Sequence, residues 1–182
     1  MKKIFILAIS LALFSTTLLA QNFSTRKGFV SFTSDASEEN INASNNDVAA
    51  VLNPVDGKGQ FIIPIKSFKF KKALMQEHFN ENYMDSDKYP KATYKYTVTD
   101  IKNVNFAKPG KYKVNTQGTM TIKQTTKNIE VPGYIIVNEN GSISIQTEFN
   151  IVLADYGVEI PKLVEKKIAK QVKIKVDTAL NK

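Results

Sequence analysis

The sequence predicts an all-β fold with short helices, made of about eight antiparallel strands. Apolar and polar side chains alternate with period two along most of the chain, as in strands with one buried face. Turn signals such as Asp56-Gly57 and Asn140-Gly141 separate the alternating runs, and one long helix-like stretch, residues 68–90, interrupts them. Such strands form a sandwich or a closed barrel, and alternation alone leaves both open.

The expected strands differ in how regular their alternation is. In the strand from residue 60 to 70, Phe61, Ile63 and Ile65 share one face, whereas Phe68 falls on the other. Pro64 has no N–H to donate, so we expect it at a bulge or a poorly paired position. A Ser/Glu/Asn-rich segment is expected to connect the first two strands. The predicted strands cover residues 28–36, 48–52, 60–70, 92–98, 112–123, 129–137, 142–153 and 172–176.

Two short helices are expected between the strands. Met75, Phe79 and Tyr83 lie at i, i+4 and i+8, with Leu74 beside them, so one side of the first helix is apolar. Pro161 can open a second helix, because a helix tolerates proline in its first turn. The apolar stripe of that second helix would consist of Ile160, Val164 and Ile168.

The N-terminus has the pattern of a signal peptide. Lys2 and Lys3 precede an apolar run from Ile4 to Leu19, which is short for a membrane span, and polar sequence follows at once. We expect residues 1–20 to be a signal peptide and residues 21–182 to form one periplasmic or secreted domain; the alternative is an uncleaved N-terminal anchor. The chain has no cysteine, so it carries neither a lipoprotein anchor nor disulfides.

The charge pattern argues against nucleic acid as a partner. Loss of Lys2 and Lys3 lowers the formal net charge from +8 to +6, and most remaining lysines are spread along the strands. This distribution favours a solvated basic surface over a patch that binds an anionic partner. No nucleic-acid-binding motif is present.

Neither a catalytic site nor a metal site can be assembled from the motifs. His78 is the single histidine, and no Gly-x-Ser-x-Gly elbow exists. The acidic run at residues 85–87 begins like a calcium loop, but Pro90 occupies the place where that loop needs glycine. Glu77 and Glu81 form an i, i+4 pair, which on an exposed helix is more often incidental than a general acid/base pair. We therefore expect no enzyme, no metal and no resident cofactor.

Three stretches, in this order, resemble a known family. They are LMQEHFNENYMDSDKYPKATYKYT (74–97), GTMTIKQTTKNIEVP (118–132) and FNIVLADYGVEIP (149–161). Together they resemble the YceI-like family of lipid- and polyisoprenoid-binding proteins, and the match covers nearly the whole chain after residue 26. The resemblance implies an antiparallel, eight-stranded, lipocalin-like β-barrel with a helix inserted between strands. A barrel of about eight strands can hold one ligand.

The family resemblance also implies a function. It favours a periplasmic or secreted carrier that binds an isoprenoid or another long-chain apolar lipid, and transient membrane contact is then expected. The bound molecule could equally carry a quinone-like head or be a plain acyl lipid. One alternative is an exported structural or stress-response protein whose barrel is filled by side chains; another is a lipid-modifying enzyme. The oligomeric state stays open, a dimer included.

The alternation of inward and outward side chains along the strands predicts which residues would line a lipid cavity. Leu74, Met75 and Phe79 would form a lid on the first helix. Leu153 stands where relatives often carry a basic residue, two positions before Asp155, which favours a neutral head group or an acyl chain over a pyrophosphate. A one-residue slip in register would exchange the two faces of a strand. The other nominated residues are Phe61, Ile63, Ile65, Tyr94, Tyr96, Val114, Met120, Ile122, Ile145, Phe149 and Ile151.

We expect export to remove the N-terminal segment. Because Ala20-Gln21 is the predicted cleavage point, intact-mass measurement on the periplasmic or secreted protein should show a chain that starts near Gln21. A mass that retains Met1 or Ile4 would contradict this prediction.

Overall fold

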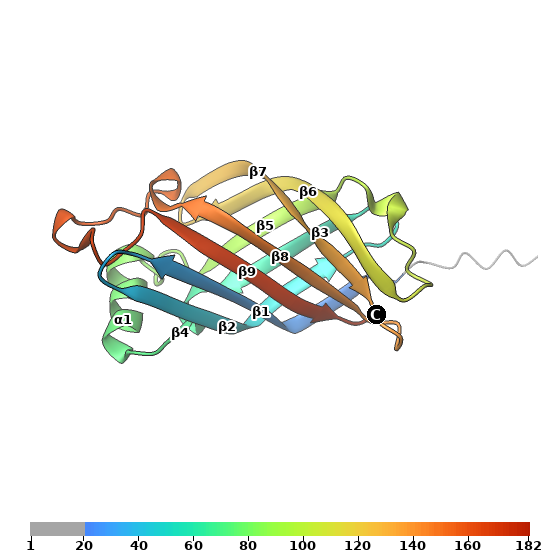
Figure 1. The fold of residues 1–182 in the computed structure, drawn as a ribbon, viewed down its shortest axis with the longest axis horizontal. Coiled ribbons are helices and arrows are strands. Elements are labelled where there is room, and N and C mark those ends of the chain that lie inside the picture. The colour runs from blue at the N-terminus through green and yellow to red at the C-terminus, as the bar shows by residue number, and fades with distance from the viewer. Residues whose placement is uncertain (1–20) are drawn as a thin grey trace, which may run out of the picture.

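A closed barrel of eight antiparallel strands forms the body of the molecule (Figure 1). The computed structural model describes residues 21–182. Neighbours around the barrel follow the order β1-β9-β8-β7-β6-β5-β3-β2, and pairing of β1 with β2 closes the circle. The strands are β1 (Phe23–Asp35), β2 (Asn40–Leu52), β3 (Lys58–Pro64), β5 (Lys91–Val98), β6 (Gly110–Ile122), β7 (Thr125–Val137), β8 (Ile143–Val152) and β9 (Gln171–Leu180).

This closure confirms the predicted eight-stranded antiparallel barrel and excludes the sandwich. Period-two alternation translates directly into an inner and an outer surface. In β5, Tyr94, Tyr96 and Val98 are buried, while Lys95 and Thr97 between them are exposed. The signal peptide predicted for residues 1–20 lies outside the described residues. In residues 21–182, no helix has the length and apolar character needed to cross a membrane.

The first two strands are longer than the sequence predicts. The segment expected to connect them belongs largely to β2, because its polar residues find partners inside the fold. Asn45 is 0% exposed; its side-chain amide donates to the Pro64 carbonyl (2.7 Å), and its Oδ1 accepts from the Asp47 N–H (2.8 Å). A buried amide satisfied in this way fits a strand interior. The hydroxyl of Thr178 on β9 similarly bonds the N–H and the carbonyl of Phe29, both at 3.0 Å.

The chain leaves the barrel ladder at Pro64, where a poorly paired position is predicted. Pro64 is the last residue of β3, and a 3₁₀ turn (Ile65–Ser67) leads to the two-residue strand β4 (Lys69–Phe70), which extends the pairing along β2. The turn breaks the period of two, so Phe68 points inward and is 6% exposed. The prediction that Phe68 lies on the outer face is therefore wrong.

Only the first of the two expected helices forms in the described residues. Helix α1 (Ala73–His78) continues into a π-helical turn (Phe79–Tyr83) at one end of the barrel. The segment after Pro161 contains only a 3₁₀ turn (Lys162–Val164), so the second helix prediction is wrong. Further 3₁₀ turns cover Ile101–Asn103 and Leu153–Tyr156.

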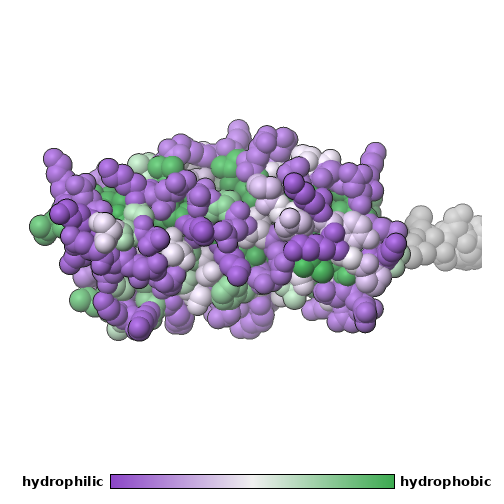
Figure 2. All heavy atoms as spheres, viewed as in Figure 1, coloured by the Kyte–Doolittle hydropathy of each residue, from purple (hydrophilic) through white to green (hydrophobic). Residues whose placement is uncertain are grey.

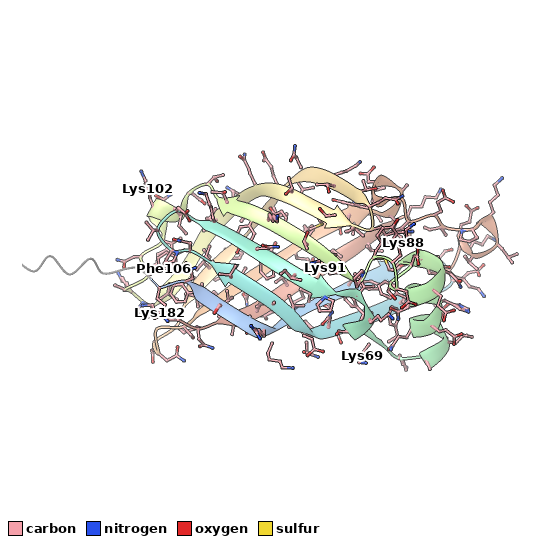
Figure 3. All side chains as sticks on the ribbon, turned by 180° about the vertical axis from the view of Figure 1, so that it is seen from behind. Lys69, Lys88, Lys91, Lys102, Phe106 and Lys182 are labelled. Atoms are coloured by element: carbon pink, nitrogen blue, oxygen red, sulfur yellow. The ribbon has the colours of Figure 1, made fainter. Side chains whose placement is uncertain are left out.

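The end of the barrel opposite α1 is filled by side chains. Leu52, Ile143 and Leu180 are 0% exposed, and Phe106 stacks on Phe23 with ring centroids 5.5 Å apart. Figure 3 shows Phe106 at this end, far from α1. This packed floor leaves the end nearest α1 as the part of the barrel that can stay open.

Gly118 on β6 permits a close approach of two strands. A Cβ at this position would lie 2.1 Å from the carbonyl oxygen of Lys95 on β5, so no side chain fits without moving the backbone. We expect Gly118→Ala to lower the free energy of unfolding by about 2 kcal/mol or more, measured by urea denaturation. Gly110→Ala in the same strand is the control, because its nearest neighbour would be 3.4 Å away. Equal losses in both variants would contradict the steric explanation.

Candidate binding cavity

A cavity of about 480 Å³ occupies the half of the barrel nearest α1. This volume lies within the range of about 300–1,000 Å³ that is typical of ligand pockets. Its wall is almost entirely apolar and draws on the strands, the lid and the turns at this end. The strand residues on the wall include Val30, Phe32, Ile63, Ala92, Met120, Ile122, Ile151, Val172 and Ile174.

The lid is anchored by a cluster of four phenylalanines. The ring of Phe79, in the π-helical turn, lies 5.6 Å from Phe32, 5.6 Å from Phe68 and 5.0 Å from Phe70, measured between centroids. Each aromatic pair of this kind contributes about 0.5–1.5 kcal/mol beyond its buried area. Helix α1 itself has no buried residue, so the lid is tied to the strands by the apolar residues that follow it, Phe79 and the buried Met84.

The cavity reaches the surface between α1 and the segment that joins β8 to β9 (residues 153–170), called the turn after β8 below. Exposed residues of both elements line it, among them Leu74, His78 and Lys167. An ion pair between Lys72 and Glu39 (2.9 Å) joins the start of the lid to the turn between β1 and β2. This opening, called the mouth below, therefore has an apolar interior and a charged edge.

A layer of tyrosines separates the cavity from the packed floor. Tyr96 stacks between Tyr94 (5.3 Å) and Phe61 (5.8 Å). The hydroxyls of Tyr94 and Thr116 are hydrogen-bonded at 2.8 Å, and the Tyr96 hydroxyl donates to the Val51 carbonyl at 3.5 Å. A second cavity of about 80 Å³ lies within this layer. Both cavities are lined by Val30, Ile63, Met120 and Ile174, so these side chains form the boundary between them.

The wall between β7 and β8 is incompletely paired. β7 pairs with β6 at thirteen positions and β8 with β9 at ten, but β7 and β8 pair only at four, from Tyr134↔Gln146 to Val137↔Ile143. Beyond them the Thr147 hydroxyl donates to the Pro132 carbonyl (2.6 Å), and Lys127 pairs with Asp155 (3.0 Å). The smaller cavity extends to this seam, because Gly133 and Thr147 line it.

Burial raises the pKa of the interior tyrosines. The effect is greatest for Tyr96, which is 6% exposed and lies beside Tyr94. Burial likewise raises the pKa of Tyr94, although its hydrogen bond with Thr116 opposes the shift. The pKa of Tyr156 is raised by burial and by the neighbouring Asp155. These phenols stay neutral, as the dry wall of an apolar cavity requires.

All fourteen residues nominated from the sequence line one of the two cavities. Whether they contact a lipid stays a prediction. Phe61, Tyr94, Tyr96, Val114, Ile145 and Phe149 border the smaller cavity, and Ile63 and Met120 border both. The remaining six border the larger cavity: Ile65, Leu74, Met75, Phe79, Ile122 and Ile151.

Several wall residues were missed by the sequence reasoning. Phe32 has inward parity in β1 and could have been found from alternation; Phe68 and Phe70 depend on the 3₁₀ turn, which alternation does not reveal. Met84 and Tyr156 lie in irregular segments without a period. Leu153, two positions before Asp155, also lies on the cavity wall. In residues 21–182, no cluster of three or more His, Asp or Glu side chains could hold a metal.

A closed eight-stranded barrel with a lidded apolar cavity defines a class of small-molecule-binding folds. The family model of the YceI-like domain matches residues 21–180. The chain therefore belongs to the YceI-like family. No curated protein matches it by sequence.

Solved structures share this fold. A polyisoprenoid-binding domain from Saccharophagus degradans, implicated in plant cell wall breakdown, superimposes with a TM-score of 0.77 at 15% identity, covering 88% of this chain and 97% of its own. BcnA from Burkholderia cenocepacia gives a TM-score of 0.70 at 19% identity, over 85% and 97% of the two chains. A YCEI protein from Campylobacter jejuni gives 0.59 at 18% identity, over 77% and 84%.

The raised pKa of Tyr96 predicts a loss of stability at high pH. Folded Tyr96 keeps its proton above pH 10, where the unfolded chain releases it, so the unfolded state binds fewer protons. The stabilisation is complete below about pH 10 and falls by about 1.4 kcal/mol per pH unit above it. Between about pH 10 and pH 11, urea unfolding should show that the native protein loses about 1 kcal/mol more than Tyr96→Phe, because the unfolded tyrosine is only half ionised at pH 10. Equal losses would show that Tyr96 ionises readily in the folded barrel.

Proposed function

We propose that the protein is an exported, non-catalytic carrier that holds one long apolar lipid chain, an isoprenoid or a chain of similar length, inside the barrel. The cavity of about 480 Å³ near α1 is the observation that carries this proposal. Each buried methylene gains roughly 0.8 kcal/mol, so about ten of them would supply roughly 8 kcal/mol before the costs of binding. An apolar chain is the ligand that such a wall favours.

Membership of the YceI-like family supports the same ligand class. The similar structure from Saccharophagus degradans is described as a polyisoprenoid-binding domain. That protein shares 15% of its sequence with this chain, so the likeness supports the fold, and the apolar wall of this cavity supports the ligand.

The head group of the lipid is proposed to be neutral. Leu153 lies on the cavity wall, and Asp155 is turned to an ion pair with Lys127 (3.0 Å). A pyrophosphate would need a buried cation that this part of the wall does not offer. The hydroxyls of Tyr83 and Tyr156, both on the wall of the larger cavity, could donate to a carbonyl such as that of a quinone.

Two other functions are less well supported. The first alternative is a structural protein whose barrel is filled by side chains. Side chains do fill the floor around Leu52 and Leu180, but the half near α1 contains a cavity. A lipid-modifying enzyme would have to use His78, which is exposed at the mouth and lies away from the dry interior. Export rests on the N-terminal pattern of Lys2, Lys3 and Ala20, and it would place the carrier in the periplasm or outside the cell, where cargo transfer needs transient membrane contact.

The carrier proposal predicts a bound lipid in protein purified from its native source. Solvent extraction followed by mass spectrometry should find about one lipid per chain. We expect Ala92→Trp to reduce this content at least about tenfold, because Ala92 lines the cavity and an indole would occupy the space of the chain. Tryptophan is apolar, so the variant should keep the fold, which circular dichroism checks.

Lys91→Trp is the matched control. Lys91 precedes Ala92 in β5 and is exposed on the outer face, so its replacement should leave the lipid content unchanged. Native-source protein that yields an empty extract would favour the side-chain-filled barrel over the carrier. Equal lipid content in both variants would place the lipid outside this cavity.

A further inference from the structure

Two leucines at the mouth are exposed without a structural reason. Leu163 is 94% exposed and Leu74 is 60% exposed, and they come from separate segments of the chain. Figure 2 shows hydrophobic atoms at this end of the molecule, over the turn after β8 and over α1, set among hydrophilic ones. Single exposed apolar residues are common, but a pair on the two edges of one cavity opening indicates a surface that binds a partner.

Both leucines belong to elements that line the same cavity. Leu74 is itself on the cavity wall, and Val164, next to Leu163, is on the wall as well. The turn is tied to β1 and the β1–β2 turn by two hydrogen bonds: the Glu38 N–H donates to the Lys166 carbonyl (3.0 Å), and the Ala169 N–H donates to the Ser34 hydroxyl (2.9 Å). These bonds anchor the part of the turn that directly follows Leu163.

The segment that holds Leu163 has the sign of charge that suits an anionic surface, whereas α1 with its flanking residues and the β1–β2 turn carry more carboxylates than lysines. Residues 157–170 carry four lysines and two glutamates. Lys166 lies 4.0 Å from Glu38, and in residues 21–182 no ion pair involves Lys162, Lys167 or Lys170. Residues 71–88, which contain α1, carry three lysines and four carboxylates. The carboxylates of the β1–β2 turn face this end too, and Glu39 among them is already paired with Lys72.

We propose that the mouth docks on the surface of a lipid bilayer that contains anionic lipids. Leu163 enters the boundary between head groups and acyl chains first, the lysines of residues 157–170 contact the anionic head groups, and Leu74 forms the second apolar contact. The cavity then opens towards the membrane, so a lipid chain passes between two apolar phases without crossing bulk water. This inference rests on the proposed function, because it assumes that the cargo is a lipid.

Vesicle co-sedimentation tests the docking surface. Full-length mature protein should bind vesicles of phosphatidylcholine and phosphatidylglycerol more tightly than vesicles of phosphatidylcholine alone, and added salt should weaken the difference. Leu163→Asp should weaken binding at least about tenfold, because a carboxylate replaces the inserted side chain and repels anionic head groups. Leu74→Asp should weaken it in the same direction by a smaller factor. Both positions are exposed, so folding should be unaffected.

Val55→Asp is the matched control. Val55 is 67% exposed in the turn between β2 and β3, at the packed end of the barrel, so its replacement adds the same charge away from the mouth. This variant should bind vesicles like the native protein. Vesicle binding that is lost equally in Val55→Asp and Leu163→Asp, or unchanged in Leu163→Asp, would overturn the proposal.

Lipid extraction from the same samples separates this inference from the carrier function. If Leu163→Asp keeps its bound lipid but loses vesicle binding, the docking surface is supported and the cavity is unaffected. If all variants retain lipid and bind vesicles equally, docking through the mouth is wrong while the carrier proposal stands. If native-source protein contains no lipid and still binds vesicles through Leu163, the carrier proposal fails, but the mouth is still supported as a membrane-docking surface.

Discussion

Closure of the barrel is the constraint on which the rest of the structure depends. Pairing of β1 with both β2 and β9 closes the sheet around the eight strands, although β7–β8, β1–β9 and β2–β3 pair at only four positions each. A closed wall forces each strand to divide its side chains between one interior and one solvent face. Close approach is then needed at a few points, such as Gly118 against Lys95, and glycine alone permits it.

The interior is divided between packing and cavity by the size and placement of its side chains. Towards the floor, Phe23, Leu52 and Leu180 are at most 1% exposed, and Phe106 stacks on Phe23, so this end is packed by side chains. Near α1, Phe32, Phe68 and Phe70 instead pack under the lid, where their rings contact one another and Phe79. These rings therefore pack against the lid, and the cavity lies beside them.

Alternation predicted the parts of this arrangement that follow from period two. It assigned Tyr94, Met120 and Ile151 to the interior correctly, because regular strands in a closed barrel cannot rotate their faces. It failed for Phe68, where a 3₁₀ turn shifts the phase, and for β2, where the buried Asn45 amide donates to the Pro64 carbonyl, a partner distant in sequence. The second helix failed because its stripe is shared between the cavity wall and solvent rather than packed on a sheet. The cavity itself depends on how inward side chains meet across the barrel, which a local pattern does not contain.

The weak attachment of the lid follows from the same division. Helix α1 buries none of its residues. The contacts of the lid include Phe79 and the buried Met84, the exposed pair of Lys72 and Glu39, and the bonds from Lys123 to the Tyr83 carbonyl (3.0 Å) and from the Phe70 N–H to Gln76 Oε1 (3.4 Å). Three aromatic pairs at about 0.5–1.5 kcal/mol each dominate this attachment, because an exposed ion pair adds at most about 1 kcal/mol. In the proposed docked state, the membrane would give these phenylalanines another apolar surrounding, so separating them would cost less there than in water. Under the proposed docking, release of a bound lipid would therefore follow from contact of the mouth with the membrane.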